Sequence, residues 1–190
     1  MSPMQQIFLG LGAVAKKTYV DDIFSTFLYK GTGSSKTVTT GIDQSGEGSL
    51  TWIKKRNGAV SHQLFDTVRG AGKVLYSDLS SAGGDFISRL SSFTSTGFTL
   101  GINGAVNASG DDYASWTFRK APGFFTCLTY VGSGSNRTIS HDLGSVPGMI
   151  LIKNISTTGE NWRCYHRSTT ATKNQNFNLP DTFYTSSNDY

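Results

Sequence analysis

The stretch Tyr29-Lys-Gly-Thr-Gly-Ser-Ser-Lys-Thr-Val38 decides the fold, because it returns about a hundred residues later as Tyr130-Val-Gly-Ser-Gly-Ser-Asn-Arg-Thr-Ile139. Paired glycines mark tight turns, and the flanking aromatic and β-branched residues mark strands. Further matches follow in the same order: Trp52-Ile53-Lys54 with Leu151-Ile152-Lys153, and Leu64-Phe65 with Cys164-Tyr165. A series of matches in order, separated by small gaps, predicts an internal repeat of roughly 100 residues.

The composition predicts an all-β protein. The 190 residues include 22 glycines and only 16% charged residues, which suits short strands joined by many turns. Apolar runs bounded by glycine, Leu50 to Lys54 and Met149 to Lys153, are typical of buried sandwich strands. We therefore expect an antiparallel β-sandwich of jelly-roll or lectin-like type. One short stretch, Asp85 to Ser92, has a helical pattern.

The repeat divides the chain into three parts. Residues 1–23 precede it and form an extended or weakly helical segment, residues 24–122 form the first β module, and residues 123–190 form a second module. The second module is incomplete, because it stops before any counterpart of the aromatic strand Tyr113 to Phe118. Either the missing strands come from the first copy, giving one sandwich of overlapping halves, or the natural protein continues past Tyr190.

The leader around Met4 to Val14 is apolar and punctuated by glycine. An apolar leader needs to be covered, so it docks either on its own domain or on a partner. It is not a signal peptide, since no positive charge precedes it, and no stretch of the chain is long enough to span a bilayer. Gly10 and Gly12 fit the dinucleotide-binding fingerprint, but no strand-helix-strand pattern with a later acidic residue follows, and no cofactor is expected.

Catalytic, metal-binding and nucleic-acid-binding signals are weak. The three histidines, His62, His141 and His166, lack close metal-ligand spacing, and the carboxylates lie mostly in turn contexts. Ser140, His141 and Asp142 are neighbours in sequence only, which does not make a catalytic triad. Cys127 and Cys164 are interpreted as free, partly buried thiols, and Lys54-Lys55-Arg56 as an ordinary solvated loop. We expect no enzyme activity and no metal site.

Exposed aromatic side chains offer a second functional class. Sugar rings stack on indoles, so a surface tryptophan near a turn is a candidate glycan platform. Trp162, between Asn161 and Arg163 and just after a turn, is the tryptophan we expect to be most exposed, with Trp116 as the other candidate. This pattern predicts a lectin-like alternative to a purely structural role.

Two groups of motifs carry a family resemblance. The leader Ile7-Phe-Leu-Gly-Leu-Gly-Ala-Val-Ala-Lys-Lys-Thr-Tyr-Val-Asp-Asp-Ile-Phe-Ser-Thr26, with Gly46-Glu-Gly-Ser-Leu-Thr-Trp-Ile-Lys54 and Leu64-Phe-Asp-Thr-Val-Arg-Gly-Ala71, resembles the start of tail-fibre or tail-associated proteins of marine T7-like podoviruses, which infect cyanobacteria or Pelagibacter. The run Thr138-Ile-Ser-His-Asp-Leu-Gly-Ser-Val-Pro-Gly-Met-Ile-Leu-Ile-Lys-Asn154, with Trp162-Arg-Cys-Tyr-His-Arg167, resembles a module repeated in such virion proteins.

The resemblance implies a structural virion protein, made in the bacterial cytoplasm and assembled into the tail. Its N-terminal segment would attach to an adaptor, nozzle or hub protein through Ile7, Phe8, Leu9, Leu11 and Tyr19. Its β modules would build a fibre or fibre base for host adhesion, as a homotrimer. The rival expectation is a carbohydrate-binding receptor module, and a polysaccharide depolymerase ranks below both. The chain ends soon after Phe183, where the family usually continues, so the receptor-binding part stays open.

Overall fold

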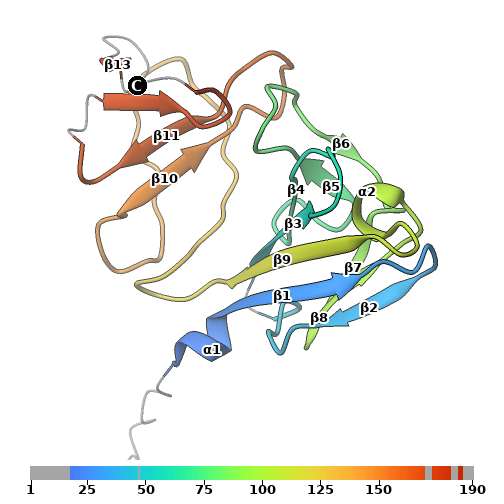
Figure 1. The fold of residues 1–190 in the computed structure, drawn as a ribbon. Coiled ribbons are helices and arrows are strands. Elements are labelled where there is room, and N and C mark those ends of the chain that lie inside the picture. Colours follow the sequence, from blue (N-terminus) through green and yellow to red (C-terminus); the bar gives the residue numbers. More distant parts are fainter. Residues whose placement is uncertain (1–17, 47, 170–172, 181–183, 186–190) are drawn as a thin grey trace, which may run out of the picture.

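The computed structural model describes residues 18–46, 48–169, 173–180, 184 and 185, and these residues form almost entirely antiparallel β-structure (Figure 1). The expected all-β sandwich fold is confirmed. A single helical turn, α1 (Val20–Ile23), leads directly into the first strand. The expected helix at Asp85 to Ser92 is wrong, because Arg89 and Gly101 are bonded through their backbones in the approach to a β-hairpin. A short helix, α2 (Gly104–Asn107), follows instead, and the side chain of Asn103 caps its N-terminus.

The first module contains two sheets. The larger has six strands in the order β1 (Phe24–Lys30), β9 (Asp112–Arg119), β3 (Ser49–Lys55), β4 (Gln63–Asp66), β5 (Lys73–Leu75) and β6 (Gly84–Asp85). The smaller has three strands in the order β2 (Lys36–Thr39), β8 (Gly97–Leu100) and β7 (Leu90–Thr94). These two sheets form the layers of a β-sandwich.

The main core lies between these two sheets. Alternate residues of a strand point to opposite faces, so the side chains of this core come from one face of the larger sheet. Ile53, Phe65 and Tyr113 enter it from the larger sheet, and Phe98 and Leu100 enter it from the smaller one; all five are fully buried. Tyr29 also lies here, stacked on Tyr113 with ring centroids 5.1 Å apart.

The second module is one four-stranded sheet in the order β10 (Met149–Ile152), β11 (Arg163–His166), β12 (Lys173–Asn176) and β13 (Tyr184–Thr185). Its strands occupy the same places in the repeat as β3 to β6, and the same neighbours are paired. The registers agree as well: Trp52 pairs with Leu64 in the first sheet, and their sequence matches Leu151 and Cys164 pair in the second.

The structural repeat therefore covers this four-stranded meander. It does not include residues 130–139, whose sequence repeats that of residues 29–38. In the first copy, Phe24–Lys30 and Lys36–Thr39 are strands that pair with β9 and β8. In the second copy, residues 122–148 contain no named strand. A strand needs a partner for its backbone groups, and no equivalents of β8 and β9 exist among the described residues of the second module.

The two modules meet face to face. The face of the first sheet that points away from the main core contributes Leu50, Trp52, Leu64 and Leu75. The second module contributes Leu151, Trp162 and Phe177 to the same cluster. No ladder joins strands of the two modules in the described part of the chain, so the second meander docks on the first through side chains and does not complete its sheet.

Candidate functional site

An open groove of about 380 Å³ lies where the two modules meet. The first module lines it with Trp52 from β3, His62 just before β4, and Ser77 and Asp78 after β5. The second module lines it with Phe177, Asn178 and Leu179, which follow β12. The groove thus exists only because the second meander docks on the first.

Trp52 and His62 form a linked pair in the groove wall. The Trp52 indole Nε1–H donates to His62 Nδ1 at 2.8 Å, and the two rings meet edge to face. This bond requires a neutral imidazole with its proton on Nε2. Burial lowers the pKa of His62, outweighing the nearby Asp78 carboxylate, which raises it; Lys54 lowers it further. His62 is therefore held in the neutral form that the tryptophan needs.

The groove combines ring faces with hydrogen-bonding groups. Phe177 packs edge to face on Trp52 with centroids 6.1 Å apart. Asp78 is exposed, and one of its carboxylate oxygens accepts the backbone N–H of His62 at 3.1 Å. Aromatic rings beside a few polar groups are typical of the lining of small-molecule sites. The arrangement can hold a small polar ligand.

Trp162 is not the exposed platform that its polar neighbours in sequence suggest. Its side chain is buried, with 5% of its surface exposed, in the cluster that joins the two modules. Its indole Nε1–H donates to the carbonyl of Tyr76 at 2.7 Å, and its backbone N–H donates to Asn178 Oδ1 at 2.8 Å. The expectation of an exposed Trp162 is therefore wrong, and the residue fastens the second module to the first.

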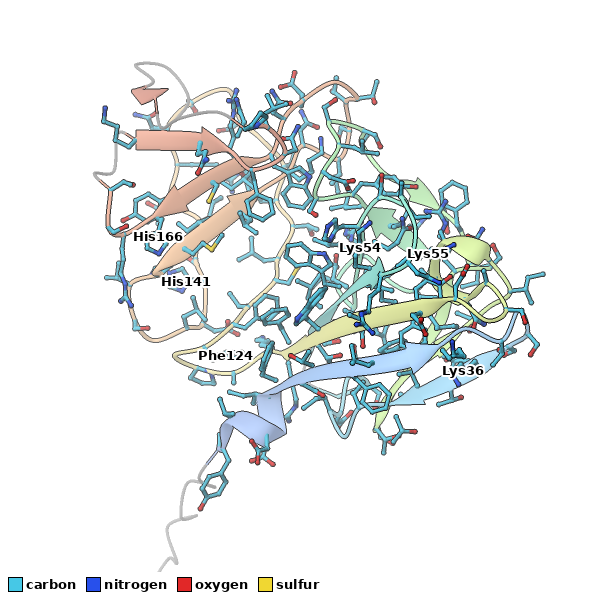
Figure 2. The ribbon with its side chains drawn as sticks, viewed as in Figure 1. Lys36, Lys54, Lys55, Phe124, His141 and His166 are labelled. Carbon is cyan, nitrogen blue, oxygen red and sulfur yellow. The ribbon has the colours of Figure 1, made fainter. Side chains whose placement is uncertain are left out.

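Trp116 is half-buried on the same face of the first sheet. It lies on β9 directly opposite Trp52 on β3, and the two indoles meet edge to face at 6.2 Å. A second aromatic cluster continues along this face, where Phe118 contacts Phe24, Phe124 and Phe125. Figure 2 shows Phe124 beyond the end of β9, where the chain turns toward the second module. Trp116 thus belongs to an aromatic layer next to the groove and does not line it.

The expected virion-anchor residues lie mostly outside the described part of the chain. Ile7, Phe8, Leu9 and Leu11 are among the residues that the structure does not describe. Tyr19 is described, and 59% of its surface is exposed at the start of α1. Its backbone N–H donates to the Asp22 carboxylate at 3.0 Å, which fixes the first turn of the helix.

The remaining candidate groups serve local structure. Asp142 forms an ion pair with Lys120 at 2.5 Å, which lowers the pKa of the Asp142 carboxyl group, and His141 Nδ1 accepts the backbone N–H of Leu143 at 3.3 Å. Ser140 lies nearby, in the lining of a second shallow hollow. No group of three or more potential metal ligands occurs among the described residues.

The basic cluster is part of a strand and its end, not of a loop. Lys54 and Lys55 belong to β3 and are marked in Figure 2. The ammonium of Lys55 pairs with Asp111 at 2.5 Å, and that of Lys54 donates to the carbonyl of Val60.

Cys127 and Cys164 are both free thiols, and burial raises the pKa of Cys127 to about 12. Within the described residues, no helix is both long and apolar enough to cross a membrane.

Sequence reasoning did not find this groove. Trp52 reads as an ordinary strand residue, and no local motif marks His62 or Phe177. The groove is created by docking between segments about a hundred residues apart in the chain.

Comparison with known proteins gives one match. Residues 20–190 match a family described as a domain of unknown function, DUF7483. No curated protein and no solved structure matches the chain.

Proposed function

The chain belongs to the DUF7483 family, and from that premise we propose that it is a structural component of a bacteriophage tail, either a tail fibre or a fibre-base protein. The observation that carries the proposal is the docked repeat: two meanders of the same design, fastened face to face by a buried aromatic cluster. Repeat proteins stack similar structural units so that each unit contacts its neighbours, and a fibre can be extended in this way. The resemblance of the leader and of Thr138 to Asn154 to tail proteins of marine podoviruses supplies the biological setting.

The docking surface has the character of a permanent joint. Its aromatic and aliphatic side chains are buried or partly buried, and polar bonds at its edge fix the relative placement of the modules. Lys153 Nζ donates to the carbonyl of Ser80 at 3.0 Å, and the backbone N–H of Gly159 donates to the same oxygen at 3.0 Å. Burial lowers the pKa of Lys153, although Glu160 opposes this effect.

In this proposal the leader attaches the chain to another tail protein, and the modules form the shaft as a homotrimer. The attachment residues are Ile7, Phe8, Leu9, Leu11 and Tyr19. No catalytic step is assigned to the chain. Adhesion to the host would depend on surfaces carried by the shaft or placed by it.

The test is incorporation into particles. Residues 2–15 would be deleted in the phage that encodes the chain, and the copy number in purified particles would be measured by quantitative mass spectrometry. Val146→Ala, at a largely exposed side chain outside the leader, is the control. We expect the control to be present at normal copy number and the truncated chain to be lost. Absence of the control from particles contradicts the structural role, and normal incorporation of the truncated chain contradicts the anchor.

A second candidate function, glycan binding, is favoured by the groove between Trp52, His62 and Phe177. Asp78→Ala removes an exposed carboxylate of the groove, and Asp85→Ala removes an exposed carboxylate on β6 as a control. Trp116→Ala tests the aromatic layer beside the groove. Binding to host lipopolysaccharide and capsule oligosaccharides would be measured on an array. Loss of binding with Asp78→Ala alone supports a groove lectin, whereas no glycan binding by the wild-type chain removes this candidate.

A further inference from the structure

β10 is an unpaired edge of the second sheet. The strand order is β10-β11-β12-β13, and no other strand of the described residues lies beside β10 (Figure 1). Free strand edges present rows of unpaired backbone groups, and proteins usually cover, shorten or charge them. β10 is short, but it carries no charge in its own sequence, because its four residues, Met149–Ile152, are all large and apolar.

The first module shows what belongs at this position. β3 is the counterpart of β10, and β3 lies between β4 and β9. Trp52 on β3 pairs with Leu64 on one side and with Trp116 on the other. Leu151, the counterpart of Trp52, pairs with Cys164 on one side only.

The backbone of β10 has the polarity needed to accept a strand. Arg167 N–H donates to the carbonyl of Gly148 at 2.9 Å, so the even-numbered residues here bond toward β11. In an antiparallel strand, the backbone N–H and C=O groups of successive residues point alternately to one side and to the other. The N–H and C=O groups of Met149 and Leu151 therefore point to the open edge. In the first module the residues matching these two, Leu50 and Trp52, pair with β9.

The outer face of the second sheet is also open. Ile150 and Ile152 have 39% and 41% of their surfaces exposed, whereas their counterparts Thr51 and Ile53 are fully buried. In the first module this face is covered by the β2-β8-β7 sheet. Both the covering strands β7 and β8 and the edge strand β9 come from one continuous stretch, Leu90 to Arg119.

We propose that β10 accepts an added extended segment with the residue pattern of β9. In the register of the first module, a residue like Trp116 lies opposite Leu151 and a residue like Phe118 lies opposite Met149. Small and hydroxyl residues like Ser115 then lie on the face of Ile150 and Ile152. Strand addition of this kind draws its affinity from the main chain and its specificity from alternate side chains.

The exposed sheet face that carries Ile150 and Ile152 indicates which segment binds beside β10. Two copies of this chain paired through their β10 strands would satisfy the edge, but they would leave Ile150 and Ile152 of both copies uncovered. A segment of the Leu90 to Arg119 type supplies the edge strand and the cover together, as it does in the first module. The inference rests on the repeat and is independent of any role in a phage tail.

The experiment uses the full chain and a fluorescein-labelled peptide with the sequence of residues 111–120, measured by fluorescence anisotropy. Met149→Pro removes an edge N–H that bonds to nothing else described, whereas Met149→Val alters the same side chain and keeps that N–H. We expect saturable binding to the wild type and to Met149→Val, and binding at least about tenfold weaker with Met149→Pro, the loss of roughly one such contact. A scrambled peptide should not bind.

Three results would overturn the proposal: no peptide binding, equal binding of the scrambled peptide, or equal binding by Met149→Pro. Self-association of the wild type that Met149→Pro abolishes would assign the edge to a second copy and would also overturn it. If the proline variant fails to fold, amide hydrogen exchange of the wild-type chain, measured with and without the peptide, tests the proposal instead. The peptide should slow exchange at Met149 and Leu151, and an unchanged rate there contradicts strand addition.

Discussion

Replacing Trp162 tests the joint between the two modules. The Trp162→Ala variant loses a buried indole that contacts Leu64 and Leu75, and it also loses the bond from Nε1–H to the carbonyl of Tyr76. Truncating a buried tryptophan to alanine costs about 3–5 kcal/mol. An unpaired buried carbonyl costs about 1–3 kcal/mol when it cannot rebond to water, and the groove beside it offers water. We therefore expect the free energy of unfolding to fall by at least about 3 kcal/mol.

The assay is urea unfolding followed by circular dichroism and by tryptophan fluorescence. Trp162→Phe keeps a six-membered ring but removes the five-membered ring of the indole with its N–H, so a loss of about 1–3 kcal/mol, smaller than that of Trp162→Ala, is expected. Val131→Ala is the surface control, because 84% of Val131 is exposed, and it should change stability by less than about 0.5 kcal/mol. A total loss of 3 kcal/mol corresponds to a melting temperature lower by about 10 °C in a chain of this size.

One result would refute the reasoning about this joint. If Trp162→Ala unfolds within about 1 kcal/mol of the wild type, the indole does not hold the modules together. A separate early transition in this variant, confined to the second sheet, would instead agree with the account, because the meander would then have lost its support.

Three further predictions follow from single residues. Gly31→Ala should cost about 1–3 kcal/mol, since the new Cβ would lie 2.1 Å from the carbonyl oxygen of Ala108, while Gly132→Ala, its repeat counterpart with nothing within 4 Å, should be neutral in the same melting assay; equal effects would contradict the structure. The folded state binds a proton on His62 more weakly than the unfolded state does, so its contribution is complete above pH 6.5 and declines as the pH falls below that value. His62→Asn should remove this part of the pH dependence of the melting temperature between pH 7.5 and 5.5, and an unchanged profile would be evidence against it. Cys127, whose pKa burial raises to about 12, should react with iodoacetamide at pH 8 far more slowly in the native protein than in urea, and equal rates would show an accessible thiol.

The sequence predicts the repeated strands well because their signals are local. Apolar runs between glycines place β3 and β10 within a residue or two, and the matches of Trp52 with Leu151 and of Leu64 with Cys164 predict the registers of two ladders. The paired glycines also keep their geometry: Gly33 and Gly134 both have positive φ, at 70° and 72°. The strands and turns are alike in the two copies because each depends on residues of its own copy.

The failures concern contacts between distant segments. Trp162 has charged and polar neighbours in sequence, which suggests exposure, but its burial depends on the first module, whose Tyr76 accepts its N–H. Tyr130 matches Tyr29 in sequence, yet Tyr29 is buried in a strand and Tyr130 is exposed outside any strand. The difference arises because β9 stands beside β1 and no described strand stands beside the second segment. Pairing partners, and not local preference, decide which copy becomes a strand.

The groove could not be predicted for the same reason. Its two walls belong to different modules, and the sequence does not specify which faces of the two meanders meet. The repeat predicts two similar sheets but is silent on their docking, which depends on the combined burial of Trp52, Trp162 and Phe177.

Cross-linking mass spectrometry on purified phage particles tests the proposed structural role most directly. Lys16 and Lys17 follow the apolar leader and provide amine cross-linking sites next to it. The account predicts that these two lysines become linked to a different tail protein, while lysines of the β modules are linked mainly within copies of this chain. Links from Lys16 and Lys17 to this chain alone, or absence of the chain from the particles, would contradict it.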